Sequence, residues 1–220
     1  MRLARELEQR LERLVEGATA AVFRGRLHPI DLADRMIRQL EFLKAESFSG
    51  PRVPNRLTLQ INSTDLDESI DRGDLGAELA TIANITATDR GWRVEGPFSV
   101  EVVATPSVPK GLVECAGTIV TGPLPAWGQL IALGGGGAHE LRHNRVMVGR
   151  AAECDVMIAV PEVSRQHAVL ARTAGEVVVA DLGSSNGTTI NSTTVMDRPV
   201  HVVPGDELAF GDRTFSFRTL

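Results

Sequence analysis

Three polar clusters in the C-terminal half of this 220-residue chain contain the residue types that bind phosphate. The first is Gly149-Arg150 at the end of an apolar run, the second is 163–168 (VSRQHA), and the third is 181–188 (DLGSSNGT). Arginine offers phosphate a planar fork of donors, hydroxyl groups donate single hydrogen bonds, and an asparagine amide can hold a peptide backbone. Together the clusters predict an anion-binding site built from loops at strand ends.

Each cluster also has an interpretation that needs no ligand. Arg150 could pair on the surface with Glu153 or Asp155. Ser164 could cap a strand, and Asn186-Gly187 could form an ordinary hairpin turn. All of these interpretations would have to hold at the same time, so the binding site is the favoured one.

An enzymatic site is the second alternative, because Ser164, His167 and Asp181 are the residue types of a hydrolase triad. The strained GxSxG elbow of many serine nucleophiles is absent, and in a strand starting near Ser164 positions 164 and 167 would point to opposite faces. The glycines 134–137 lack the Gly-Lys-Ser/Thr of a phosphate loop and predict a hairpin instead. The chain is therefore expected not to be an enzyme.

The elements that must position these clusters are short strands. From Gly128 onward, apolar runs such as RVMVGR, HAVLART and EVVVADL are separated by glycine, asparagine, aspartate or proline. This spacing predicts an all-β sandwich or barrel. The three clusters, in this order, resemble the forkhead-associated (FHA) family, and the resemblance covers nearly all of 128–220 and includes PGDELAFG.

The resemblance implies a sandwich of about eleven strands that binds phosphothreonine in extended peptides, without cofactor or metal. Carried onto this sequence, it implies that Arg150 and Ser164 hold the phosphate with Arg165 as a third contact, and that Ser185 and Asn186 contact the phosphothreonine and its flanking backbone. The resemblance also implies that three residues support the site structurally, namely Gly149, His167 and Gly187.

Two further positions bear on peptide preference. Glu162 lies in a loop where, by the resemblance, it would disfavour acidic residues after the phosphothreonine. The family often has Asn-Gly after the next short strand, whereas this chain has Asn191-Ser192. Because serine adopts positive φ poorly, that turn is expected to differ.

The N-terminal half has a different pattern, which predicts an α+β domain. Helices are expected over 2–18, from Pro29 to about residue 48, and over 66–88, and strands over 56–61 and 94–103. A further edge strand is possible within 111–120. The expected organisation is an α+β domain at 1–115, a short linker at 116–127 and the β-domain at 128–220.

This half resembles the N-terminal domain of actinobacterial FhaA-type proteins, in LERLVEGATAAVFRGRLHPIDLADRMIRQLE, VPNRLTLQI and GWRVEGPFSVEVV. The resemblance implies an adaptor downstream of bacterial Ser/Thr kinases, near cell-envelope synthesis, whose partners are threonine-phosphorylated kinase substrates. The alternative is an RNA-binding or scaffold protein that acts through the α+β domain.

Composition limits the remaining classes of function. The chain is 43% hydrophobic and 23% charged with a net charge of −5, and residues 1–48 hold nine Lys/Arg against eight Asp/Glu, which argues against nucleic-acid or membrane binding. No run approaches the ~18–20 apolar residues of a membrane span. Cys115 and Cys154 lack metal-ligand spacing. We expect a cytoplasmic protein.

Overall fold

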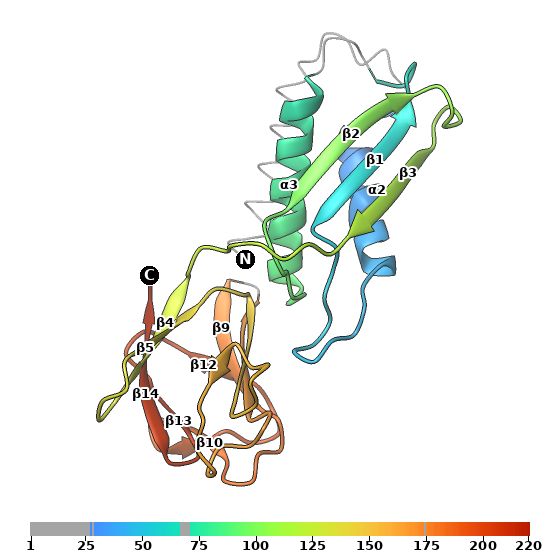
Figure 1. Ribbon diagram of the computed structural model, residues 1–220. Helices are drawn as coiled ribbons and strands as arrows, with labels where there is room; N and C mark the ends of the chain where they lie inside the picture. The colour runs from blue at the N-terminus through green and yellow to red at the C-terminus, as the bar shows by residue number, and fades with distance from the viewer. Residues whose placement is uncertain (1–26, 28, 67–70, 174) are drawn as a thin grey trace. The chain divides into compact units, whose positions relative to one another are not determined.

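The chain forms two compact units (Figure 1). The computed structural model describes residues 27, 29–66, 71–173 and 175–220. One unit comprises Met1–Glu46, Pro51–Arg90 and Val94–Pro123, and the other comprises Ser47–Gly50, Gly91–Arg93 and Leu124–Leu220. The first unit is α+β and the second is all-β, which confirms the fold class that the sequence predicts.

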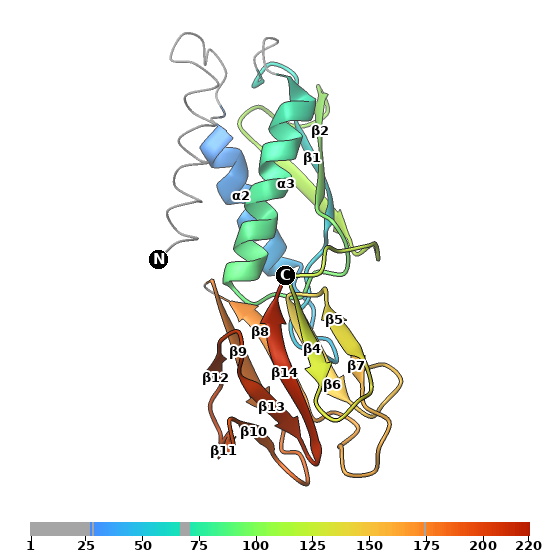
Figure 2. The ribbon, with the colours of Figure 1, turned by 90° about the vertical axis from the view of Figure 1, so that its left-hand side faces the viewer.

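In the residues that the structure describes, the first unit is a three-stranded sheet with two helices on one face (Figures 1 and 2). The central strand β1 pairs in parallel with β2 and antiparallel with β3. No helix in the described residues is long and apolar enough to cross a membrane. The elements are α2 (Pro29–Phe42), β1 (Arg56–Asn62), α3 (Arg72–Asp89), β2 (Ser99–Thr105) and β3 (Val113–Thr118).

The alternation of β1 determines which face of the sheet the helices cover. Leu57, Leu59 and Ile61 are fully buried on the helix side, where they remove apolar surface from water. Helix α3 lies so close to β2 at Gly76 that a Cβ there would collide with the Val100 carbonyl oxygen. Glycine at this position therefore allows the helix to pack directly on the strand.

Four expected elements of this unit differ in extent or lie outside the described residues. Helix α2 ends at Phe42 rather than near residue 48. The chain turns before α3 because Asn62 Oδ1 accepts from the Thr64 amide and hydroxyl, and the helix starts only after its N-cap Asp71. Strand β2 begins at Ser99 rather than residue 94, since Pro97 has no N–H to donate to a ladder. The helix expected over 2–18 lies outside the described residues.

The edge strand expected within 111–120 is β3, and it continues to Thr118, three residues into the expected linker. Cys115 lies on the helix side of this strand, in register with buried Leu59. Burial raises the pKa of the Cys115 thiol to about 11, so it stays protonated near neutral pH.

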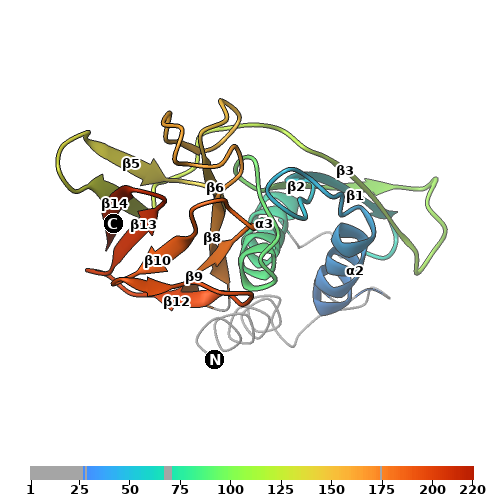
Figure 3. The same ribbon diagram turned by 90° about the horizontal axis from the view of Figure 1, so that it is seen from below.

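The second unit is a sandwich of eleven strands in two sheets (Figure 3). One sheet has the order β11-β10-β13-β14-β4-β5 and the other has the order β12-β9-β8-β6-β7. The strands are β4 (Gly128–Ala132), β5 (Ala138–Leu141), β6 (Arg145–Gly149), β7 (Val156–Met157), β8 (Ala168–Thr173), β9 (Glu176–Asp181), β10 (Thr188–Ile190), β11 (Thr193–Thr194), β12 (Val200–Val202), β13 (Glu207–Phe210) and β14 (Arg213–Thr219).

The inner faces of both sheets form one apolar core. Leu130, Phe210 and Phe217 of the first sheet and Val148 and Leu170 of the second are fully buried in it. Burying a side chain of this size stabilises the fold by roughly 1.5–3 kcal/mol. This core fixes the strand ends and thereby the loops between them.

The turn between β10 and β11 contains Asn191-Ser192 as its two central residues, and both have positive φ, 48° and 67°. This is the type I′ geometry that suits the twist of a hairpin. The Asn191 side chain donates to Asp206 Oδ1 at 2.8 Å and accepts from the Glu207 amide at 2.9 Å. Ser192 therefore adopts the backbone conformation that glycine would adopt more easily.

We predict that Ser192→Gly raises the free energy of unfolding by about 0.5–1 kcal/mol, because it removes the left-handed strain of a residue with a Cβ. Urea unfolding at pH 7 measures the change. The matched control is Asn191→Gly, which also relieves positive φ but loses two side-chain hydrogen bonds and should not stabilise. A Ser192→Gly protein no more stable than wild type would contradict this account.

Candidate functional site

The three polar clusters lie at strand ends of the sandwich. Gly149 ends β6, the segment 163–167 enters β8 at Ala168, and the segment 182–187 connects β9 with β10. Because β6 and β9 both pair with β8, these ends lie at the same side of the sheet. The fold thus brings the clusters together, although they are spread over forty residues of sequence.

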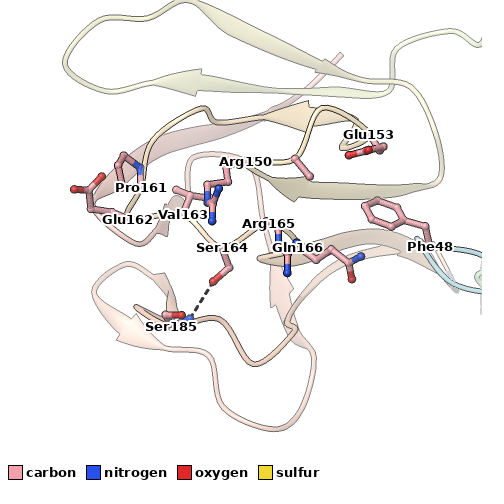
Figure 4. Close-up of a pocket in the computed structure, with 11 residues that line it drawn as sticks. Phe48, Arg150, Glu153, Pro161, Glu162, Val163, Ser164, Arg165, Gln166 and Ser185 are labelled. Carbon is pink, nitrogen blue, oxygen red and sulfur yellow. Dashed lines mark hydrogen bonds between the residues drawn. The ribbon is translucent and has the colours of Figure 1, made fainter.

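An open pocket of about 850 Å³ lies between these loops (Figure 4). Four of the five residues that the sequence predicts as ligand contacts line it, and Asn186 does not. The lining residues are Phe48, Arg150, Ala151, Glu153, Pro161, Glu162, Val163, Ser164, Arg165, Gln166 and Ser185.

Backbone hydrogen bonds hold the Arg150 loop against the Ser164 loop. The Arg150 amide donates to the Ser164 carbonyl at 3.0 Å, and the Ala151 amide donates to the Arg165 carbonyl at 3.2 Å. Gly149 permits this approach, because a Cβ at this position would collide with the Arg165 carbonyl oxygen. The same pairing brings both arginine side chains to one pocket.

His167 connects the Ser164 loop to the third cluster. Its ring is fully buried, and Nδ1 accepts a hydrogen bond from the Ser164 amide at 3.1 Å. The other nitrogen, Nε2, therefore carries the proton and donates to the Gly187 carbonyl at 3.0 Å. The ring also meets Phe210 edge to face, with 5.8 Å between centroids. The imidazole thus joins two loops to the core.

The Ser164 hydroxyl is oriented by its neighbour across the pocket. Ser164 Oγ accepts a hydrogen bond from the Ser185 amide at 3.1 Å (Figure 4). Because this bond uses a lone pair of the oxygen, the hydroxyl proton remains available as a donor. A ligand oxygen in the pocket is a suitable acceptor for it.

Arg150 supplies positive charge without an ion-pair partner among the described residues. The surface pairing considered from the sequence does not form with Asp155, whose carboxylate instead binds Arg93 at 2.8 Å and His143 at 3.0 Å. Burial raises the pKa of Asp155, but the hydrogen bonds from His143 and Arg93 outweigh it, and the pKa lies well below its ordinary value. The exposed Arg150 guanidinium lies in the pocket near Ser164 (Figure 4).

Asn186 is exposed and does not line the pocket. Its amide Nδ2 donates to the Glu162 carbonyl at 2.8 Å, which ties the third cluster to the loop before Val163. Gly211, in the turn between β13 and β14, approaches the same carbonyl so closely that a Cβ would collide with it, and its amide donates to Gly187. The contact of Asn186 with a ligand remains a prediction.

Asp181 organises the third cluster. Its Oδ1 accepts from the Gly183 and Ser184 amides at 2.9 and 2.8 Å, and its Oδ2 accepts from the Ser184 and Thr188 hydroxyls at 2.7 and 2.6 Å. Burial raises the pKa of this carboxyl, but these hydrogen bonds from Thr188, Ser184 and Gly183 outweigh it and lower the pKa. The carboxylate therefore fixes the loop that carries Ser185.

A hydrolase triad is not assembled by Ser164, His167 and Asp181. Both ring nitrogens of His167 bind backbone groups, so neither is free to take the Ser164 hydroxyl proton, and Asp181 Oδ2 lies 4.0 Å from Nε2. The expectation that positions 164 and 167 point to opposite faces of one strand was wrong, because β8 begins at Ala168 and neither residue lies in it.

Sequence reasoning missed four residues that shape the site. Asp181 was considered only as a triad member, although an Asp before a Gly-Ser turn is a known signal for side-chain capping of the loop. Gly211 and Cys154 carry no such signal, and Cys154 donates through Sγ to the Arg165 carbonyl at 3.2 Å. Phe48 is about a hundred residues away in sequence from the other lining residues.

In the part of the chain that the structure describes, no group of three or more His, Cys, Asp and Glu side chains could hold a metal ion. The pocket instead combines guanidinium groups with hydroxyl groups, a donor set that suits an anion rather than a cation.

Two known families match different parts of the chain, although the first match also includes Ser47–Gly50 and Gly91–Arg93, which group with the second unit. Residues 4–116, more than half of the chain, match the family described as FhaA, N-terminal domain. Residues 146–211 match the FHA domain.

Similar individual proteins match less than half of this chain. Mouse proliferation marker protein Ki-67 is 34% identical over 85 residues, which are 38% of this chain and 3% of that protein, so the chain spans a small part of its curated relative. The structure of Mycobacterium tuberculosis EmbR in complex with a low affinity phosphopeptide is 29% identical, with a TM-score of 0.40 over 42% of this chain and 24% of that one. An FhaA FHA domain complexed with the intracellular domain of Rv3910 is 27% identical, with a TM-score of 0.38 over 41% and 99%.

We predict that Asp181→Asn lowers the free energy of unfolding at pH 7 by about 1–3 kcal/mol, because an amide accepts these hydrogen bonds less strongly than a carboxylate. Because folding lowers the pKa of Asp181, the contribution of its carboxylate to the free energy of unfolding is complete above the unfolded-state pKa of about 3.9. This contribution is lost as the pH falls through the lower pKa of the folded state. The difference between wild type and variant should therefore shrink below about pH 4.

Urea unfolding at pH 7 and at pH 3 measures this difference. The control is Asp197→Asn, which makes the same chemical change at an exposed carboxyl. Equal stability losses for the two variants, or a loss at position 181 that does not depend on pH, would contradict the assignment of Asp181 as the loop's anchor.

Proposed function

This chain belongs to the family of proteins with the FhaA N-terminal domain and carries an FHA domain, and from this premise we propose that it is a non-catalytic adaptor that binds phosphothreonine-containing segments of other proteins. The observation that carries the proposal is the pocket in which Arg150, Ser164, Arg165 and Ser185 meet. Two guanidinium groups and an oriented hydroxyl are donors for a doubly charged anion.

The chemistry of a phosphate suits this pocket better than that of a carboxylate. A phosphothreonine brings a charge of about −1.5 to −2 and three strong acceptor oxygens. Each charge-assisted hydrogen bond contributes roughly 1.5–3 kcal/mol net, and three or four of them correspond to micromolar binding of a short peptide at about −8 kcal/mol. The unphosphorylated peptide keeps none of these bonds.

The loops are held in place before any ligand arrives. His167, Asp181 and Asn186 use their polar groups on neighbouring backbone and side chains within the unit. Binding therefore costs little ordering of the protein, and the donors need not leave other partners. In this proposal Ser185 and Asn186 contact the phosphothreonine and its flanking backbone, Asn186 through the amide N–H and oxygen that its bond to Glu162 leaves available. Gly149, His167 and Gly187 support the site.

The partners follow from the chemistry of the ligand. A phosphothreonine is made by a protein kinase, so the adaptor's partners are substrates of a Ser/Thr kinase in the cytoplasm. By analogy with FhaA-type proteins, the pathway is a bacterial one near cell-envelope synthesis; this part rests on family resemblance and not on the site. A pull-down from kinase-active lysate with wild type and Arg150→Ala in parallel identifies the phosphate-dependent partners.

The RNA-binding alternative finds no support on the open face of the three-stranded sheet. The register places Arg56, Glu101 and Glu114 on this face, opposite the one that the helices cover. This mixture of charges gives little attraction for a phosphate backbone, which RNA-binding surfaces meet with clustered Lys and Arg. The anion-binding pocket of the second unit is the better-supported site.

We predict that wild type binds a phosphothreonine peptide chosen from an oriented library with low-micromolar affinity, and that Arg150→Ala weakens this binding at least tenfold, because it removes one or two charge-assisted hydrogen bonds. Isothermal titration calorimetry at 0.15 M salt measures both affinities, with the unphosphorylated peptide as the ligand control.

The protein control is Arg218→Ala, which removes the same charge from an exposed position of β14 outside the pocket. It should bind like wild type. The proposal fails if phosphorylated and unphosphorylated peptides bind equally, or if the Arg150 and Arg218 variants lose affinity to the same extent.

A further inference from the structure

The pocket has an apolar wall that the FHA match does not include. Phe48 lines the same cavity as Arg150 and Ser164, yet it lies far outside residues 146–211. Its side chain is exposed, with 43% of its surface accessible. In Figure 4 it lies beside Gln166 and near Glu153, on the opposite side of the pocket from Glu162. The pocket therefore extends from the two arginines to an aromatic ring that Gln166 and Glu153 flank.

The turn that carries Phe48 is anchored to the strand that leads into the phosphate-binding loop. Residues Ser47–Gly50 belong to the second compact unit. The Ser47 and Gly50 backbones exchange hydrogen bonds of 3.1 and 3.0 Å, and the carbonyl of buried Ser49 accepts from Arg145 Nε at 2.8 Å. Arg145 begins β6, and this strand ends at Gly149, immediately before Arg150.

Gly50 is required for this anchor. Its φ is +107°, and a Cβ there would lie 2.7 Å from Arg145 Nε. The tight turn therefore places the Arg145 guanidinium directly against the backbone next to Phe48. Through this contact the aromatic ring and the Arg150 loop are positioned by one and the same strand.

The size of the cavity shows that a phosphate does not fill it. The open pocket has a volume of about 850 Å³, which is larger than one phosphate group, so neighbouring residues of a peptide can also lie along it. The end that Phe48 forms can remove apolar peptide surface from water, and aromatic side chains are frequent anchors of this kind in interfaces. The nearby Glu153 would repel an acidic residue at the same place.

We propose that Phe48 is a specificity-determining residue, which contacts a large apolar side chain at one position of the phosphopeptide. This inference rests on the proposed phosphothreonine-binding function. The phosphate supplies most of the affinity through Arg150 and its neighbours, and Phe48 selects among phosphorylated segments by their flanking sequence. The segment before the FHA domain thereby contributes to the choice of partner.

The test uses the full chain and an oriented peptide library with a fixed phosphothreonine, in which one flanking position at a time is varied. Wild type is expected to select Leu, Ile, Met or Phe at one position over Ala. Phe48→Ala should reduce this selection about fivefold, whereas its preference for phosphothreonine over threonine should fall much less than that of Arg150→Ala. The matched control is Phe42→Ala, which truncates a phenylalanine 81% exposed and outside the pocket.

The possible outcomes separate this inference from the function on which it rests. Phe48 does not determine specificity if wild type and Phe48→Ala show the same selection at every position, or if Phe42→Ala loses selection equally. The proposal of phosphate-dependent binding would still stand in either case. If wild type shows no preference for phosphothreonine over threonine, both proposals fall. Thermal unfolding of the two variants shows whether either substitution disturbs the fold.

Discussion

The buried imidazole of His167 is the contact on which the geometry of the pocket depends. It accepts from the Ser164 amide, donates to the Gly187 carbonyl and packs against Phe210. Two loops from different strands are thus fixed to the apolar core by one neutral ring. An alanine at this position would leave the Ser164 N–H without this partner, and an unpaired donor that is shielded from water costs about 1–3 kcal/mol. The Gly187 carbonyl would keep only its hydrogen bond from the Gly211 amide.

The polar groups of this site therefore have two roles, which are to hold the loops and to bind a ligand. Groups that point into the protein satisfy its own backbone, as the Asp181 carboxylate does for the third cluster. Groups that point into the pocket keep donors for a ligand, as Arg150 and the Ser164 hydroxyl do. Because the inner contacts are made before binding, the outer donors are preorganised for an anion.

The sequence predicted the sandwich and the clustering of its polar loops, because alternation and turn residues are local signals. It could not predict how loops meet. Asn186 donates to Glu162, and Gly211 packs on the same carbonyl, contacts that depend on the register of strands far apart in sequence. Phe48 is the extreme case, since its turn is held at the pocket by a hydrogen bond that Arg145 donates to the Ser49 carbonyl.

The most direct test of the account is to titrate N-acetyl-phosphothreonine amide into the ¹⁵N-labelled chain and follow the backbone amide resonances by NMR. This minimal ligand isolates the phosphate contacts from those to flanking residues. The account predicts that the largest shifts fall on Arg150, Ser164, Arg165 and Ser185, and that N-acetyl-threonine amide leaves them unmoved. Shifts that map instead to the three-stranded sheet, or that are equal for both ligands, would contradict it.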